Sequence, residues 1–113
     1  MTLLIDTANY EKARIALLEN NRCLAENIFP AKRELSQKLL PKIDKLLKKT
    51  GIPLSDLKAI SVNLGPGSFT GLRIGVAVAN SFAFALNIPI NDQPIGKFAA
   101  PEYGKEANIT KPV

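Results

Sequence analysis

The residues with the types and spacing to do chemistry lie in a glycine-rich run, Gly65–Gly75, and in the turn after the first apolar segment. Glycine-rich turns that lead into a helix often hold phosphates, because free backbone N–H groups and the positive end of the helix dipole face the ligand. Such turns also serve only to redirect the chain, and Gly-x-Gly alone does not separate the two uses. The candidate phosphate-binding residues are Asp6, Thr7, Gly65, Gly67 and Ser68.

Purely structural roles compete with phosphate binding at these positions. The glycines on both sides of Pro66 allow positive φ angles and a sharp turn. Ser68 and Thr70 are candidate N-caps for a following helix, since their hydroxyl oxygens can accept from its first free N–H groups. Asp6 is suited to accept hydrogen bonds from the backbone of its own turn, and we favour that role over phosphate binding.

The composition excludes several classes of site. The 113 residues include no histidine and one cysteine, Cys23, which excludes Ser-His and Cys-His hydrolases and argues against a zinc site. One cysteine allows no internal disulfide, which is typical of a protein in a reducing cytoplasm. The N-terminus lacks the pattern of a signal peptide, and the apolar window at residues 74–90 contains polar residues and a proline. We therefore expect a cytoplasmic protein that does not cross a membrane.

Two elements must position the glycine-rich run. Residues 59–64 alternate apolar and polar side chains, which predicts a strand, and residues 69–86 are almost entirely apolar, which predicts a buried helix. Small residues recur every four positions along this helix, and they leave room for another backbone to approach: Gly71, Gly75, Ala79 and Ala83. The sequence leaves open whether this ridge packs on the first helix of the same chain or across a dimer.

The remaining elements predict a single α/β domain with a mixed sheet of about five strands and two main helices. Strands are expected at residues 2–6, 12–19, 22–29, 59–64 and 87–91. The first three would form an antiparallel meander, because only short turns separate them. The domain would span residues 1–91, followed by an extended or partly disordered tail at residues 92–113, with Phe98 and Tyr103 as possible anchors.

The first main helix is expected at residues 34–49, where apolar residues recur at three- and four-residue spacing. Pro41 predicts a kink or a loosened first turn, and Gly51 suits the left-handed position after the last turn. Basic residues concentrate here and contribute to a net charge of +5: Lys32, Arg33, Lys38, Lys42, Lys45, Lys48 and Lys49. They could bind RNA or an acidic partner, but we favour a solvated helix face because no aromatic residues lie between them.

The helix at residues 69–86 is apolar on nearly all sides and must be covered on nearly all sides. A sheet and one further helix leave part of it uncovered in a domain of this size. We therefore expect a partner interface on the two helices. The residues predicted for it are Leu35, Leu39, Ile43, Leu46, Gly71, Gly75, Val76, Ala79, Asn80 and Ala83.

The glycine-rich run as a whole resembles the hallmark of the TsaB (YeaZ) family, which helps to make threonylcarbamoyladenosine in tRNA. Residues 4–8, 35–43 and 88–90 resemble further parts of that family, although Leu35 stands where the family commonly has histidine. The resemblance implies an actin-like and Hsp70-like fold (ASKHA, RNase H-like). It implies a non-catalytic subunit that pairs with a TsaD-like catalytic subunit through its two helices.

The same resemblance implies a homodimer when the chain is alone, a possible TsaE-like ATPase partner, and contact with tRNA through the complex. The family usually has a second half, and residues 101–105 resemble the segment that closes the full-length protein. We expect either a reduced natural form or a truncated piece. With only one wall of a nucleotide cleft, the chain should have no cofactor and no ATPase or transferase activity, and a nucleotide would bind only at the partner interface. The alternatives are an enzyme related to glycoprotease-like metallopeptidases, which we disfavour, and a basic tRNA-binding module.

Overall fold

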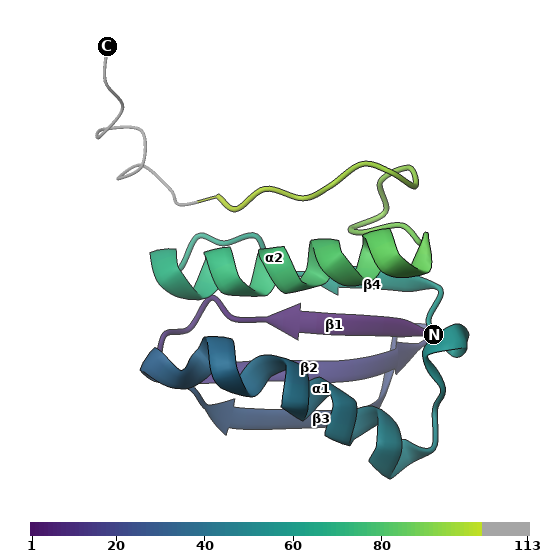
Figure 1. Ribbon diagram of the computed structural model, residues 1–113, viewed down its shortest axis with the longest axis horizontal. Helices are drawn as coiled ribbons and strands as arrows, with labels where there is room; N and C mark the ends of the chain where they lie inside the picture. The colour runs from purple at the N-terminus through teal and green to yellow at the C-terminus, as the bar shows by residue number, and fades with distance from the viewer. Residues whose placement is uncertain (103–113) are drawn as a thin grey trace.

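The computed structural model describes residues 1–102, which fold as one four-stranded mixed sheet with two helices on one face (Figure 1). The strands are β1 (Thr2–Asp6), β2 (Lys12–Glu19), β3 (Arg22–Pro30) and β4 (Ala59–Val62). Their order is β3-β2-β1-β4, with β1–β2 and β2–β3 antiparallel and β1–β4 parallel. The predicted meander is confirmed, since tight turns join its three strands.

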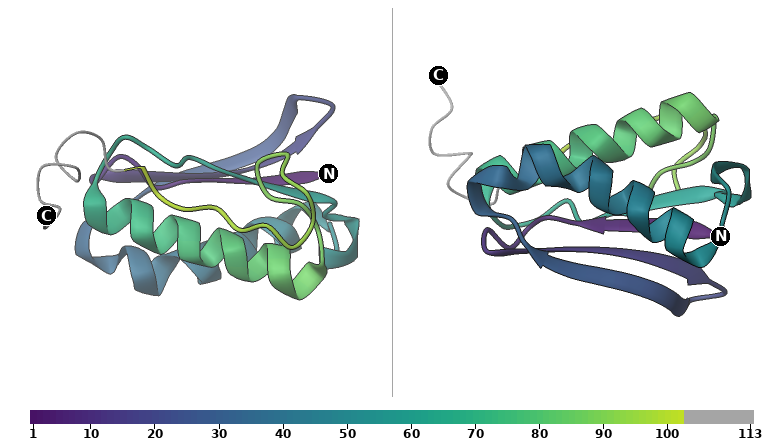
Figure 2. Two further views of the ribbon diagram at one scale, coloured as in Figure 1. Left: turned by 90° about the horizontal axis from the view of Figure 1, so that it is seen from above. Right: turned by 60° about the horizontal axis from the view of Figure 1, so that its bottom comes forward.

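The helices are α1 (Leu35–Thr50), preceded by the short 3-10 turn η1 (Lys32–Glu34), and α2 (Phe69–Leu86); a second 3-10 turn, η2 (Leu54–Asp56), precedes β4. Both helices lie on the same side of the sheet (Figure 2), with α1 over β2 and β3 and α2 beside β1 and β4. The core forms between these two layers, where alternate residues of each strand meet one stripe of each helix.

The first helix forms where its apolar spacing predicts it. Leu35, Leu39 and Ile43 face the sheet and are at most 5% exposed. Gly51 adopts φ 72°, and its N–H donates to carbonyl oxygens of the last turn, as expected for a left-handed C-cap. Pro41 lies inside the helix. The expected position and end of this helix are confirmed within one residue.

The second helix is long and apolar enough to cross a membrane by length and composition alone. Its small-residue face packs on the sheet, and six of its residues are buried: Gly71, Leu72, Gly75, Val76, Ala79 and Ala83. A helix that forms part of the core of a globular domain has the same composition.

The fifth strand predicted at residues 87–91 is reduced to one parallel bridge between Ile60 and Ile90, so the sheet has four strands in the described residues. Asn91 has φ 51° and Asp92 has φ 60°, and these left-handed residues turn the chain away from β4. The side chain of Asn91 takes over the pairing, accepting from Val62 N at 2.8 Å and donating to Val62 O at 3.0 Å. An amide side chain thus does what a longer strand would do.

The segment after this turn, residues 92–102, runs back along α2 (Figure 2). Asn80 holds it by two hydrogen bonds, to Ala99 O at 3.0 Å and from Ala99 N at 2.9 Å. The expected anchor Phe98 contacts Phe84 with ring centroids 6.3 Å apart, while Tyr103 lies outside the described residues. The segment is therefore fastened chiefly by its backbone, through a polar residue of α2.

Candidate partner surface

The glycine-rich run joins β4 to α2 and needs glycine for two different reasons. Gly65 has φ 108°, which disfavours any residue with a Cβ. Gly67 does not have a positive φ, contrary to expectation. It is required instead because a Cβ there would lie 2.6 Å from Ala8 O. The run is thus pressed against the turn that follows β1.

The residues considered for phosphate binding do come together, but their polar groups are bonded to neighbouring residues of the same two turns and of the first turn of α2. Ser68 N donates to Ala8 O at 2.8 Å, and Ser68 Oγ accepts from Gly71 N at 3.2 Å, which makes Ser68 the N-cap of α2. Thr70 is exposed and belongs to the first turn of the helix. Of the two candidate caps, Ser68 is confirmed.

The turn after β1 is closed by its own side chains. Asp6 Oδ1 accepts from Ala8 N and from Asn63 Nδ2, both at 3.1 Å. Asn63 Oδ1 in turn accepts from Gly65 N at 2.9 Å. Asp6 therefore holds its own turn and connects it to the glycine-rich run, as the structural role assigned to it requires.

The small-residue ridge of α2 receives Thr7, the one polar residue that is buried among those described. Thr7 Oγ1 donates to Gly71 O at 2.6 Å, and its side chain lies directly over Gly75, where an added Cβ would be 3.1 Å from Thr7 Cβ. At these two glycines the ridge accommodates the turn after β1. It packs there on neither the first helix nor a partner.

The residues predicted to form the partner interface are placed differently from that prediction. Nine of them are buried in the core or against the sheet of this chain: Leu35, Leu39, Ile43, Leu46, Gly71, Gly75, Val76, Ala79 and Ala83. The tenth, Asn80, is half-buried and bonds to Ala99. The apolar stripe found by periodicity is therefore the core stripe.

One patch of uncovered apolar surface lies next to this stripe, in the groove between the two helices. A hollow of about 250 Å³, here called the helix-pair hollow, is lined by Leu40, Val78, Ser81, Phe82 and Ala85. Leu40 is 52% exposed, and Ser81 and Ala85 are exposed as well. The sequence analysis missed these residues, although each lies one or a few positions from a predicted one. The sequence carries no signal that separates Leu40 from Leu39, because both are leucines and only the helix direction exposes one of them.

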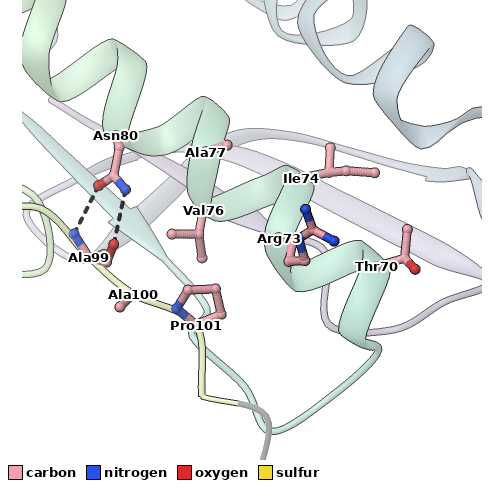
Figure 3. Close-up of a pocket in the computed structure, with 9 residues that line it drawn as sticks. All are labelled: Thr70, Arg73, Ile74, Val76, Ala77, Asn80, Ala99, Ala100 and Pro101. Carbon is pink, nitrogen blue, oxygen red and sulfur yellow. Dashed lines mark hydrogen bonds between the residues drawn. The ribbon is translucent and has the colours of Figure 1, made fainter. Parts of the chain in front are cut away.

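A larger groove of about 650 Å³ lies on the other side of α2, between this helix and residues 99–101 (Figure 3). Asn80 closes one end of it by its hydrogen bonds to Ala99, and Val76 and Ile74 lie along the helix. The guanidinium of Arg73 lies 5.5 Å from the centroid of the Phe69 ring, which holds a positive charge at this groove. Within residues 1–102, no cluster of His, Cys, Asp or Glu could hold a metal ion.

The comparisons with known proteins agree with this architecture. The family model for TsaD, tRNA N6-adenosine threonylcarbamoyltransferase, matches residues 25–92. The tRNA threonylcarbamoyladenosine biosynthesis protein TsaB is 44% identical over 92 residues in Bacillus subtilis and 36% identical over 88 residues in Escherichia coli. These matches cover 80% and 78% of this chain, but 40% and 37% of the relatives. The chain thus spans about two fifths of their length.

Among solved structures, YeaZ from Pseudomonas aeruginosa superposes with a TM-score of 0.72 at 39% identity. The superposition covers 79% of this chain and 41% of that structure. The actin-like half-domain expected from the sequence is therefore confirmed, with four strands in the sheet.

Proposed function

Because this chain belongs to the protein family of TsaB (YeaZ) and the transferase TsaD, we propose that it is a non-catalytic subunit in the synthesis of threonylcarbamoyladenosine at position 37 of tRNA. Its role would be to pair with a TsaD-like catalytic subunit through α1 and α2. The relatives carry names that place them in this biosynthesis, and they support the proposal as far as the shared two fifths of their length allows.

The observation that supports pairing is the helix-pair hollow. Its lining is almost entirely apolar, and it lies between the two helices, with Leu40 from α1 and the other lining residues from α2. Exposed aliphatic and aromatic side chains gathered in one concave place are typical of protein interfaces. An apolar helix face of a partner would fill this hollow and cover Leu40.

The proposal of a non-catalytic role is supported by the state of the candidate phosphate site. Asp6, Thr7 and Ser68 each bond to another part of the same turn assembly. A nucleotide would have to displace these bonds or bind where a partner supplies the other wall. We therefore expect no ATP turnover by the chain alone, and nucleotide binding at most at the partner interface. No observation in the described residues favours a metallopeptidase.

Pairing is tested by co-elution of the chain with a TsaD-like protein in size-exclusion chromatography. The double variant Leu40→Glu/Ala85→Glu places two charges in the helix-pair hollow at exposed positions, so it should fold and fail to co-elute. Leu24→Glu/Ile28→Glu is the matched control, because it also adds two charges, and Leu24 and Ile28 are 55% and 54% exposed on β3, away from the hollow. Normal co-elution of the double variant, or equal loss in the control, would refute this placement.

Three finer assignments belong to the same proposal. Without its partner, the chain would form a homodimer through the helix-pair hollow, which light scattering would detect as a doubled mass lost in Leu40→Glu/Ala85→Glu. A TsaE-like ATPase would join only the assembled pair. The site of action of the chain would be the cytoplasm, where tRNA is modified.

A further inference from the structure

One flank of α1 carries only positively charged side chains. Four lysines follow one another at spacings of four, three and four residues, which places them on one side of a helix. These residues, here called the lysine flank, are Lys38, Lys42, Lys45 and Lys49. The first and the last lie eleven positions apart, so the row is about 16 Å long at 1.5 Å per residue.

The lysine flank faces the β3 edge of the sheet, away from the helix-pair hollow. Lys42 Nζ lies 5.6 Å from the centroid of the Phe29 ring on β3, which fixes the direction of this flank. Leu40, which lines the hollow against α2, points to the other side, about half a helical turn away. A ligand on the lysine flank would leave the hollow free for a protein partner.

The charges of the flank are largely uncompensated. Lys42, Lys45 and Lys49 form no ion pair within residues 1–102. Lys38 pairs with Glu34 at 2.9 Å and so contributes less to the net positive charge of the flank. Lys48, the neighbouring lysine that pairs with Asp44 at 3.0 Å, lies off this flank. Three adjacent cations therefore repel one another along the row, and a polyanion would relieve that repulsion.

The positive surface continues beyond the start of α1. A hollow of about 360 Å³ there is lined by Pro30, Ala31, Lys32, Arg33, Glu34 and Lys38. Lys38 thus belongs both to this hollow and to the lysine flank. The two form one track with six basic side chains and a single carboxylate, that of Glu34.

From this arrangement we infer that the lysine flank, with Lys32 and Arg33, binds the sugar–phosphate backbone of an RNA. The choice of RNA rests on the proposed role in tRNA modification. A lipid surface fits less well, because the apolar stripe of α1 is buried against the sheet and none of it is left to enter a bilayer. Helix α1 has no aromatic residue, so the track contacts phosphates and does not stack on bases.

The test is binding of an unmodified tRNA transcript to the full chain, measured by fluorescence anisotropy at several salt concentrations. Six phosphate contacts, one for each basic side chain of the track, give a slope of about −4.2 to −5.4 in log K against log salt, so affinity falls about 300- to 1,800-fold between 50 and 200 mM salt. Lys45→Glu/Lys49→Glu should weaken binding and make the slope shallower by about two. Both side chains are exposed and unpaired, so folding should be unaffected.

The control is Lys58→Glu/Lys97→Glu, which changes the net charge equally at two exposed lysines outside α1. Equal weakening in both variants would show that only net charge matters and would overturn the inference, as would undetectable tRNA binding at 50 mM salt. If the chain bound vesicles of anionic phospholipid more tightly than tRNA, and Lys45→Glu/Lys49→Glu lost that binding, the ligand of the track would be a membrane surface and the RNA inference would be overturned. Co-elution with the TsaD-like partner is measured separately on the same variants. A failure of the pairing proposal can therefore be distinguished from a failure of the RNA-binding inference.

Discussion

The contact between Thr7 and the small-residue ridge can be tested by adding one methyl group. In Gly75→Ala the new Cβ would lie 3.1 Å from Thr7 Cβ and Thr7 Cγ2, and closer still to Thr7 Oγ1. Thr7 is 1% exposed and therefore has no free space into which to turn. The variant must push the turn after β1 away from α2 or break the bond from Thr7 Oγ1 to Gly71 O.

The size of the effect follows from three terms. Overpacking of a rigid core costs about 1–3 kcal/mol. Loss of the bond from Thr7 Oγ1 to Gly71 O adds about 1 kcal/mol. Replacement of a helical glycine by alanine returns about 1 kcal/mol through helix propensity. The variant should therefore lower the free energy of unfolding by about 1–3 kcal/mol, with a fall in Tm of about 4–8 °C for each kcal/mol.

Urea denaturation of a double-mutant cycle decides whether Thr7 is the cause. Thr7→Ala alone should cost about 1–2 kcal/mol, through the lost bond and a small void. In Thr7→Ala/Gly75→Ala the methyl group enters the space that Thr7 vacated, so the double variant should be more stable than the sum by at least about 1 kcal/mol. Ser81→Ala, exposed on the same helix, should change stability by less than about 0.5 kcal/mol. Additive losses, or a neutral Gly75→Ala, would refute the close approach.

Two further outcomes are expected, each with Thr70→Ala as the control because Thr70 is exposed. Asn80→Ala removes both bonds to Ala99, so trypsin should cleave after Lys97 several times faster, and an unchanged rate would mean that other contacts hold the segment. Ser68→Ala removes the N-cap of α2 and should lower the free energy of unfolding by about 1 kcal/mol in urea denaturation, whereas an equal loss in the control would show that capping is not the reason.

The fold could be read from the sequence wherever one periodicity persists over a whole element. The bounds of β1, β2 and α2 agree with prediction, because each is a continuous apolar or alternating run that ends at turn residues. Residues 87–91 also look like a strand, but their pairing depends on the left-handed conformation of Asn91 and Asp92. Asn and Asp adopt this conformation more readily than other residues with a side chain, but a turn of two residues leaves no periodic signal.

The candidate site was harder to predict, because sequence shows which residues are apolar and not what covers them. The spacing of Gly71 and Gly75 correctly indicated a close approach, yet what approaches is Thr7, 64 residues from Gly71 in the chain. Leu39 and Leu40 are adjacent and equally apolar, but Leu39 is fully buried and Leu40 is half exposed. Only the direction of the helix relative to the sheet distinguishes a core residue from an interface residue here.

The geometry of α1 shows how a chain this small can serve a core and two ligands at once. A helix presents about three separate faces, since 3.6 residues complete each turn. On α1 the first face, with Leu39 and Ile43, enters the core; the second, with Leu40, borders the helix-pair hollow; the third is the lysine flank. Because neither ligand would need residues of the core, Leu40→Glu/Ala85→Glu should abolish pairing while tRNA binding persists, and Lys45→Glu/Lys49→Glu should do the reverse. Loss of both pairing and tRNA binding in either variant would mean that the two faces act as one surface.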